Sequence, residues 1–358
     1  MDLVILVGGK GTRIAKKLKN LPKPMVKFYN KPFLSVILQE YLKFPFEKVY
    51  LLCGYRGNII FKKYHNKYLN LAKIKCVTEK YPLGTGGALN LIKKKISKKF
   101  VLTNGDSFLD YDFTNFFNSN NNHQNTMVLI NNLNYKSNKK LANLKLVKKN
   151  FIKFSKNAKL MNAGIYFLNK KIFKKFKNEV FSIENDFFES EIKKKKLLGK
   201  LVKNYFIDIG TYPNLKLANQ TLAKAIYHKI ALFDLDYLLN QKYICIEKKS
   251  LFISNNLIRL FQYYHNKGHQ IYFMVIKKIL SNNHLKKIKG YLFKKNLKSF
   301  FIFFQKKQDH LNSIKDLNNI NIDWKNSLYI GNHKIKLKCD KYKIDDIIGQ
   351  INFKKKLS

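Results

Sequence analysis

The stretch LVILVGGKGTR at residues 3–13 decides the fold of the amino-terminal part of this 358-residue chain. Its first five residues are all aliphatic, which predicts a strand buried on both faces, as in a parallel sheet. Gly8 and Gly9 then predict a tight turn at the carboxyl end of that strand. Glycines in such a turn let backbone N–H groups come close to an anion such as phosphate. We therefore expect an α/β domain that binds a ligand at this turn.

The same alternation of short apolar runs and helix-length segments continues beyond the first strand. Further strands are expected at residues 49–53, 74–77, 100–103 and 126–130, and a helix is expected to open at Pro32. This rhythm predicts a three-layer α/β domain with a mostly parallel sheet, whose ligands bind beyond the carboxyl ends of the strands. A helix over residues 214–228 closes the domain, and a second, smaller α/β pattern begins with a strand at residues 230–233. The predicted domains are therefore residues 1–228 and 229–358.

The composition limits the classes of partner. The net charge is +48, but only three of the 70 basic residues are arginines, and the lysines are spread along the whole chain. A nucleic-acid binder would gather its basic residues on one face, so we expect a solvated lysine surface and no nucleic-acid partner. The same scarcity makes Arg13 informative, because a planar guanidinium binds phosphate through two bonds in a way that lysine does not reproduce.

The cysteines and the apolar runs indicate a cytoplasmic protein. The four cysteines lie far apart without a Cys-x-x-Cys pair, which argues against a disulfide framework and a zinc ribbon. The longest apolar runs are too short to cross a bilayer, and the amino terminus does not resemble a signal peptide. We expect no membrane insertion, and a homo-oligomer stays possible.

Two motifs near the amino terminus carry the first chemistry. The loop Gly8-Gly9-Lys10-Gly11-Thr12-Arg13 is neither a Gly-x-Gly-x-x-Gly fingerprint nor a Walker loop. It is followed by Pro22-Lys23-Pro24-Met25, in which two prolines stiffen the segment that carries Lys23. An ordinary glycine-rich turn and an ordinary proline-rich loop would explain either motif alone. Together they favour a phosphate site in which Lys23 and Arg13 are the cations.

The pair of motifs resembles the signature of the sugar nucleotidyltransferase family, and the resemblance extends over roughly residues 1 to 225. Several later segments keep the order of that family's motifs. They are residues 79–88 (EKYPLGTGGA), 104–106 (NGD), 162–166 (NAGIY), 183–188 (IENDFF) and 206–211 (FIDIGT). Within the family, the chain most resembles D-glycero-α-D-manno-heptose 1-phosphate guanylyltransferases.

The resemblance implies a role for each motif. Arg13 and Lys23 would be the catalytic residues, and Asp106 and Asp208 would bind Mg²⁺. Asn162, Gly164 and Glu184 would bind the sugar. The nucleotide would be bound by Gly8, Gly9, Gly11, Thr12, Gly84 and Thr85. The substrates would be a nucleoside triphosphate and a sugar 1-phosphate.

Physical chemistry is consistent with these roles. The attacking phosphate of a sugar 1-phosphate has a second pKa of about 6, so it is largely a dianion at neutral pH and needs no general base. The reaction needs alignment of the two phosphates and neutralisation of their charge, which cations and Mg²⁺ provide. A lone aspartate after a strand is more often a helix cap than a metal ligand, and Asp106 differs through its motif and its partner Asp208.

The second domain resembles a different family. Asp234 and Asp236 follow a strand in the sequence FDLDYLLN (233–240), which resembles the first motif of haloacid-dehalogenase (HAD) phosphatases. We expect this domain to be an inactive relative of a heptose bisphosphate phosphatase. Tyr237 and Leu238 replace a small residue and a hydroxyl, the strand at 271–276 ends without a hydroxyl, and Asn332 and Lys336 stand where acidic residues are expected. Asp340 and Asp345 are the candidate replacements for them.

The predicted function is a transferase that joins GTP to a heptose 1-phosphate and makes GDP-heptose for cell-surface polysaccharide. Two alternatives stay open: a mannose- or glucose-1-phosphate nucleotidyltransferase that uses GTP, UTP or dTTP, and a non-catalytic scaffold or regulatory protein. The motifs decide neither the base nor the sugar.

Overall fold

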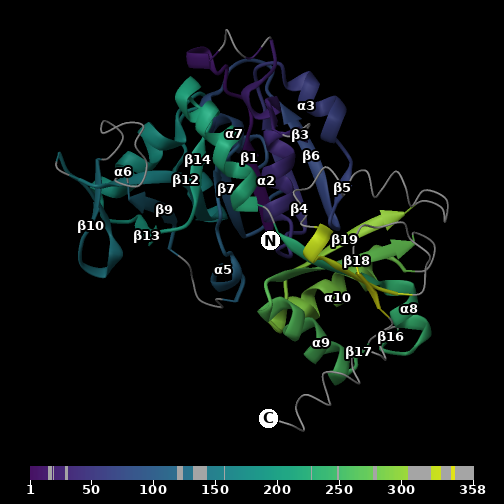
Figure 1. Cartoon of the computed structure of the whole chain (residues 1–358). Helices are drawn as coiled ribbons and strands as arrows, with labels where there is room; N and C mark the ends of the chain where they lie inside the picture. Colours follow the sequence, from purple (N-terminus) through teal and green to yellow (C-terminus); the bar gives the residue numbers. More distant parts are fainter. Residues whose placement is uncertain are drawn as a thin grey trace. The chain divides into compact units, whose positions relative to one another are not determined.

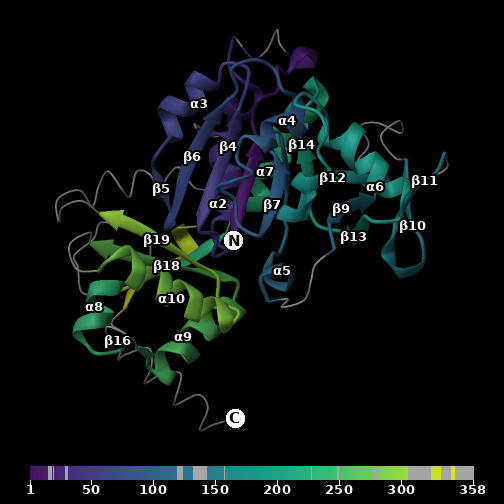
Figure 2. The same ribbon diagram turned by 180° about the vertical axis from the view of Figure 1, so that it is seen from behind.

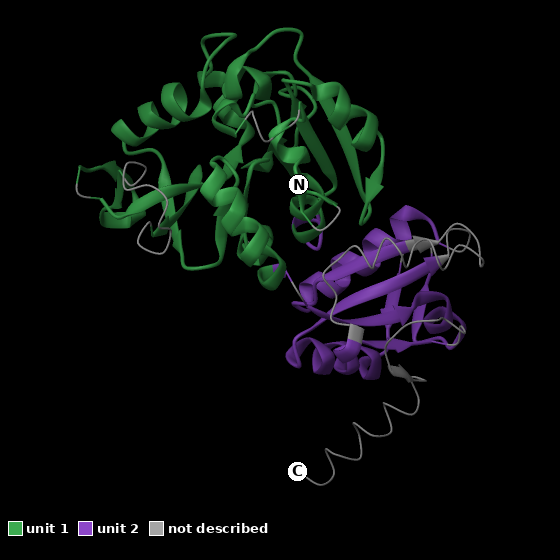
Figure 3. Cartoon of the chain, turned by 45° about the horizontal axis from the view of Figure 1, so that its top comes forward, with its two compact units in different colours: residues 1–40, 46–225 green, residues 41–45, 226–358 purple. Residues whose placement is uncertain are grey.

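The chain forms two compact units, which are coloured separately in Figure 3. The structure is a computed structural model that describes residues 1–14, 18, 20–28, 31–118, 124–131, 143–156, 158–226, 228–247, 250–276, 280–304, 324–331 and 340–342. Unit 1 contains residues 1–40 and 46–225, and unit 2 contains residues 41–45 and 226–358. The sequence predicted a domain boundary at residue 228, two residues after the start of the main segment of unit 2. It did not predict that the short segment 41–45 belongs to unit 2.

Unit 1 is built on a ten-stranded sheet with the order β11-β10-β12-β7-β1-β4-β6-β5, in which β9 pairs with β12 and β13. Its centre is a group of four parallel strands: β7 (Lys99–Asn104), β1 (Asp2–Leu6), β4 (Lys48–Cys53) and β6 (Ala72–Thr78). These strands and β9 (Thr126–Asn131) lie within a residue or two of the strands predicted from the apolar runs. The α/β prediction is confirmed for this unit.

The prediction of a mostly parallel sheet was wrong for the outer half of unit 1. Antiparallel pairs join β12 (Leu160–Asn169) to β7 and β9, and β10 (Leu144–Leu146) to β11 (Ile152–Phe154). β5 (Tyr68–Leu69) is also antiparallel to β6, whereas β13 (Leu198–Val202) is parallel to β9. A parallel connection needs a crossover of a dozen or more residues. The link from β10 to β11 is only a short turn, so these strands form a hairpin.

Helices cover both faces of the central strands (Figures 1 and 2). Figure 1 shows α2 (Phe33–Tyr41) and α7 (Tyr212–Ile226) in front of the sheet, and Figure 2 shows α4 (Gly84–Asn90) on the opposite side. On the α4 side, Val4, Tyr50 and Leu102 belong to one buried cluster with Ala88 and Leu89 of that helix. The central strands carry apolar side chains on both faces of the sheet, and each face packs against a layer of helices, as the uninterrupted apolar run at residues 3–7 predicted.

Unit 2 has a five-stranded parallel sheet with the order β19-β18-β15-β20-β21. Its strands are β15 (Lys229–Asp234), β18 (His269–Ile276), β19 (Ser299–Phe304), β20 (Leu328–Ile330) and β21 (Asp340–Tyr342). The helices are α8 (Leu235–Asn240), α9 (Asn255–Asn266) and α10 (Asn282–Lys294), and β16 (Ile244–Ile246) forms a hairpin with β17 (Leu251–Ile253). Serines cap α9 and α10, because Ser254 and Ser281 accept backbone N–H bonds from the first turns.

No helix in the described part of the chain is long and apolar enough to cross a membrane.

Candidate active site

Two cavities of about 540 and 330 Å³ lie in unit 1, and they share Lys23, Asn104 and Asp106 in their walls. Among the residues predicted from the sequence, the larger cavity is lined by Gly8, Gly9, Gly84, Thr85 and Glu184. The smaller cavity is lined by Gly11, Thr12, Arg13, Asn162, Gly164 and Asp208. Every site residue predicted for the first domain therefore lines one of two adjoining cavities.

The glycine turn brings two strand ends into backbone contact. A Cβ added to Gly8 would lie 2.9 Å from the backbone nitrogen of Gly54, which follows β4. Tyr55 N also donates to the Gly8 carbonyl at 3.0 Å. At Gly9 an added Cβ would meet no atom within 4 Å. The first glycine thus permits close packing of the two loops, and the second leaves open space beside the cavity.

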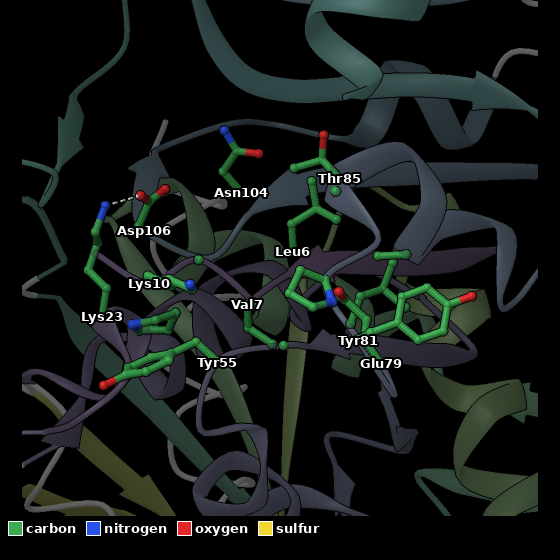
Figure 4. A pocket seen from close by; sticks show the side chains of 18 of the residues that line it. Leu6, Val7, Lys10, Lys23, Tyr55, Glu79, Tyr81, Thr85, Asn104 and Asp106 are labelled. Atoms are coloured by element: carbon green, nitrogen blue, oxygen red, sulfur yellow. Dashed lines mark hydrogen bonds and ion pairs between the residues drawn. The ribbon is translucent and has the colours of Figure 1, made fainter. Parts of the chain in front are cut away.

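Lys23 and Asp106 form an ion pair where the two cavities adjoin. Lys23 Nζ lies 2.7 Å from Asp106 Oδ2, as the dashed line in Figure 4 shows. Lys23 is flanked by two prolines and begins a short 3₁₀ helix (Lys23–Met25). The side chain of Lys23 is only 15% exposed. The stiff backbone and the limited exposure hold the ammonium group at this junction.

Asp208 is placed beside Asp106 by a two-stranded ladder. β14 (Phe206–Asp208) pairs with β8 (Ser107–Leu109) so that Asp208 is opposite Ser107, and Ile209 N donates to the Asp106 carbonyl at 2.9 Å. Gly210 N and Asn214 Nδ2 each donate to the Asp208 carboxylate at 2.8 Å. Two carboxylates that are distant in sequence are thereby brought to the same cavity.

Asn162 and Gly164 are held by a local network on β12. Asn162 Oδ1 accepts from Gly164 N at 2.9 Å, and Asn162 Nδ2 donates to Tyr166 Oη at 2.6 Å. Tyr166 is fully buried, and this burial raises its pKa well above 10. Gly164 has a φ of +72°, and an added Cβ would lie 2.9 Å from the Asn104 amide nitrogen. Asn162 is therefore fixed in the smaller cavity, whereas Glu184 lines the larger one.

Residues 3–225 match the family described as nucleotidyl transferase. The chain belongs to the nucleotidyl transferase family.

Two relatives of this nucleotidyl transferase are named D-glycero-α-D-manno-heptose 1-phosphate guanylyltransferase. The protein from Campylobacter jejuni is 34% identical over 59% of this chain and 95% of its own length. The protein from Aneurinibacillus thermoaerophilus is 32% identical over 62% of this chain and 98% of its own length.

A solved structure resembles the same part of the chain. It is HddC from Yersinia pseudotuberculosis complexed with GMP-PN, at a TM-score of 0.52 and 28% identity, covering 62% of this chain and 99% of that protein. The predicted nucleotidyltransferase fold is thus confirmed for the first unit.

Several further residues of the nucleotidyl transferase line the larger cavity and were not among the predicted site residues; they include Lys10, Tyr55, Glu79 and Tyr81 (Figure 4). Lys10 lies within the glycine loop, and Glu79 and Tyr81 lie within the motif at 79–88. The predicted motifs therefore included these residues, but the sequence did not indicate that they line the site. Tyr81 donates a hydrogen bond to Glu179, and this bond raises the pKa of the tyrosine. Tyr55 had no signal in the sequence, because it reaches the cavity only through the contact between Gly8 and Gly54.

Asn214 was also missed. It is 3% exposed, and it lies in the first turn of α7, where it holds the Asp208 carboxylate. An asparagine in a helix has no individual sequence signal, and its importance follows only from the fold.

In unit 2, the two aspartates of the second motif are buried. Asp234 is 1% exposed; its Oδ1 accepts from Tyr237 N at 3.1 Å and caps α8, and its Oδ2 accepts from Tyr329 Oη at 3.3 Å. Asp236 is 7% exposed. Asn332, Lys336 and Asp345 lie outside the described residues. Within the described part of unit 2, the Asp234 carboxylate therefore takes part in structural hydrogen bonds.

Proposed function

We propose that this nucleotidyl transferase moves a guanylyl group from GTP to D-glycero-α-D-manno-heptose 1-phosphate and releases pyrophosphate. Transfer of a nucleotidyl group to a sugar 1-phosphate is the activity in the names of these relatives, which include an Arabidopsis thaliana protein named probable mannose-1-phosphate guanylyltransferase 2 that is 28% identical. The two relatives named for heptose, which the chain covers almost end to end, support the heptose substrate. The product would serve cell-surface polysaccharide synthesis.

The observation that carries the choice of GTP is the position of Glu79. Its carboxylate lines the larger cavity, and Oε2 accepts from Leu83 N at 2.9 Å. Oε1 lies beside the glycine turn, 3.2 Å from the position of a Cβ added to Gly8. The side chain is thus anchored by one oxygen at the strand end where the nucleotide loop begins.

A carboxylate accepts hydrogen bonds and donates none when ionised. Guanine offers two adjacent donors, N1–H and the N2 amino group, on its pairing edge. Uracil and thymine offer one donor flanked by two carbonyl acceptors, which an ionised carboxylate would repel. Glu79 therefore favours guanine by attraction and disfavours the pyrimidine diones by repulsion.

The chemical step needs alignment more than proton transfer. A phosphate oxygen of the sugar 1-phosphate attacks the α-phosphorus of GTP, the bond from that phosphorus to the bridging oxygen breaks, and pyrophosphate leaves with the electron pair. Lys23, at the junction of the cavities, would contact the reacting phosphates, and Arg13 would bind the departing pyrophosphate. The Lys23–Asp106 ion pair would have to open for this contact.

Asp106 and Asp208 suit a magnesium site. Both supply oxygen to the smaller cavity, and the described residues contain no group of three or more His, Cys, Asp or Glu placed to hold a metal. Mg²⁺ is typically bound by one or two carboxylates together with substrate phosphates, which is what this pair can provide. Bound Mg²⁺ would neutralise charge on the phosphates. Asn214 and Gly210 would keep the Asp208 carboxylate oriented toward it.

The alternatives differ in base, sugar or class. A mannose or glucose acceptor would use the same cavities, so only the acceptor assay separates it from heptose. A non-catalytic scaffold is disfavoured, because Arg13, Lys23, Asp106 and Asp208 all line the cavities together.

Unit 2 would be an inactive HAD-like domain. Its parallel sheet has an aspartate at the end of the β15 strand, as that class of phosphatase requires. The nucleophile of a phosphatase must reach its substrate, whereas Asp234 is buried and engaged with Tyr237 and Tyr329.

A panel of nucleoside triphosphates and sugar 1-phosphates, followed by pyrophosphate release with Mg²⁺, tests the proposal. We expect turnover with GTP and the heptose 1-phosphate, and a reduced preference for GTP over UTP in Glu79→Gln. Glu189→Gln, on the surface of α6 (Glu189–Lys193), is the control for loss of one negative charge. A preference for another triphosphate in the wild type, or an unchanged preference in Glu79→Gln, would reject the assignment of GTP or of its determinant.

A further inference from the structure

The hydroxyl of Thr85 hydrogen-bonds to Glu184, and both residues line the larger cavity. Thr85 Oγ1 donates to Glu184 Oε2 at 2.6 Å and accepts from Ile183 N at 2.9 Å. A hydroxyl has one proton, so Thr85 cannot donate to a nucleotide while it holds Glu184. The nucleotide-binding role predicted for Thr85 would therefore have to use a group other than this hydroxyl proton.

Glu184 is held through one oxygen only. Ser182 Oγ also donates to Oε2, at 3.2 Å, so both lone pairs of that oxygen are occupied. Within the described chain, Oε1 accepts no hydrogen bond, and the half-buried Glu184 lines the larger cavity. One carboxylate oxygen is thus anchored by two hydroxyls, and the other keeps its capacity for ligand hydroxyl groups.

The backbone around this contact is tightly packed. Gly86 N donates to the Phe181 carbonyl at 3.0 Å, and Phe181 N donates to the Leu83 carbonyl at 3.1 Å. A Cβ added to Gly84 would lie 2.4 Å from the Phe181 carbonyl oxygen, and one added to Gly86 would lie 2.0 Å from its ring. Gly84 and Gly86, in the first turn of α4, therefore permit the segment before Glu184 to cross directly over the start of this helix.

The helical segment that carries Glu184 is also unusual. Ile183–Phe188 forms a π-helix, a conformation that occurs mostly as a single turn next to α-helical residues and frequently at functional sites. Ser182 caps it by accepting from Asn185 N at 3.2 Å. The π turn carries Glu184 beside Thr85 and runs directly into α6 at Glu189.

We infer that Thr85 is a positioning residue that fixes Glu184, so that its free oxygen binds hydroxyl groups of the sugar in the sugar 1-phosphate. Thr85, which belongs to the motif at 79–88 that was predicted to bind the nucleotide, then affects the affinity for the sugar 1-phosphate. The inference rests on the proposed function, because it takes the ligand of Glu184 to be the sugar of the acceptor.

Thr85→Val and Thr85→Ser separate this role from a direct nucleotide contact. Valine keeps the shape and removes the hydroxyl, so we expect KM for the sugar 1-phosphate to rise about tenfold or more, the scale of one lost hydrogen bond to a charged group. KM for the triphosphate should stay within about twofold of the wild-type value, because a residue that acts through Glu184 does not contact the nucleotide. Serine keeps the hydroxyl and should restore the wild-type KM for the sugar phosphate.

A double-mutant cycle with Glu184→Gln shows whether Thr85 acts through Glu184. Both single variants should weaken binding of the sugar phosphate, and Thr85→Val should add less than about a further twofold in the Glu184→Gln background. Thermal melting of each variant checks that the protein remains folded. A rise in KM for the triphosphate alone, an unchanged KM for the sugar phosphate, or independent effects in the cycle would overturn the inference.

The outcome is distinguishable from failure of the proposed function. Turnover of the wild type with UTP instead of GTP would reject the guanylyl assignment, and the cycle would then be measured with UTP. Calorimetric titration of the wild type and Thr85→Val with the sugar 1-phosphate alone gives a second readout that does not depend on turnover. Equal affinities of the two proteins would count against Thr85 while leaving the transferase assignment intact.

Discussion

Asp106 and Asp234 occupy comparable places in the two units, and their environments differ sharply. Each lies at the carboxyl end of a parallel strand, after β7 in unit 1 and as the last residue of β15 in unit 2. The Asp106 side chain is 36% exposed, lines both cavities and pairs with Lys23. Asp234 is 1% exposed, caps a helix and accepts from Tyr329.

The comparison shows that a strand-end aspartate is a functional candidate only when the fold leaves it accessible. In unit 1 Asp106 lines both cavities, and a cation faces it. In unit 2 a cap and a tyrosine hydroxyl satisfy the carboxylate of Asp234, which is the ordinary role of an aspartate before a helix. The following predictions test whether this difference in environment is a difference in function.

The largest effect is expected at the cation that faces Asp106. Lys23→Ala should lower turnover by at least about a hundredfold, because an electrostatic contact to the transition state is worth several kcal/mol. Arg13→Lys should also reduce turnover, because lysine lacks the two-pronged geometry of guanidinium. Lys27→Ala is the matched control, since Lys27 is exposed and lines neither cavity. Near-normal steady-state turnover in both site variants would remove these residues from the mechanism.

A smaller but specific effect is expected at the paired carboxylates. Asp106→Asn and Asp208→Asn should each weaken the apparent Mg²⁺ affinity by about 10–100-fold, because each removes a negative charge and an ionised ligand. The measurement is turnover against Mg²⁺ concentration, with thermal melting to verify folding.

The control for the magnesium titration is Asp110→Asn. Asp110 is exposed, lies four positions beyond Asp106 and lines neither cavity. An unchanged Mg²⁺ titration in Asp106→Asn or Asp208→Asn would show that the aspartate concerned is structural, and the contrast with Asp234 would disappear.

Asp234 should show the reverse pattern. Asp234→Ala should leave nucleotidyl transfer within about twofold of the wild type and destabilise unit 2 by about 1 kcal/mol, the scale of a lost helix cap. The measurements are turnover and chemical denaturation. We also expect no phosphate release from heptose 1,7-bisphosphate with Mg²⁺ in the full chain. Phosphate release that Asp234→Asn abolishes would prove that unit 2 is a working phosphatase.

The sequence predicted the central strands and part of the lining of the cavities because both depend on local patterns. Aliphatic runs specify buried strands, and the motifs that contain Lys23, Asp106 and Asp208 lie at strand ends or on stiff loops. The antiparallel outer strands were not predicted, because apolar runs do not encode strand direction. The contacts of Thr85 with Glu184 and of Tyr329 with Asp234 join residues nearly a hundred positions apart. No pattern along the chain indicates which distant side chain will take a given hydrogen bond.

The last prediction concerns the stability of unit 2 as a function of pH and leaves turnover aside. His228 is half-buried with its ring nitrogen Nε2 enclosed, and desolvation, with a smaller contribution from Lys43, lowers its pKa from 6.5 to about 2. The folded unit therefore keeps His228 neutral, whereas the unfolded chain takes up a proton as the pH falls through 6.5. The unfolded state binds more protons between these two pKa values, so stability must fall as the pH decreases in that window. Protonation of this group in the unfolded chain should lower the free energy of unfolding by about 0.7 kcal/mol between pH 7 and pH 6, and by at most about 1.4 kcal/mol for each further unit of decreasing pH.

His228→Phe keeps an aromatic ring without the titration and should flatten the dependence of the free energy of unfolding on pH. His265→Phe, at an exposed position of α9, should leave that dependence unchanged. Equal slopes in wild type and His228→Phe, measured by urea denaturation from pH 7.5 to 5, would mean that His228 is not buried in its neutral form.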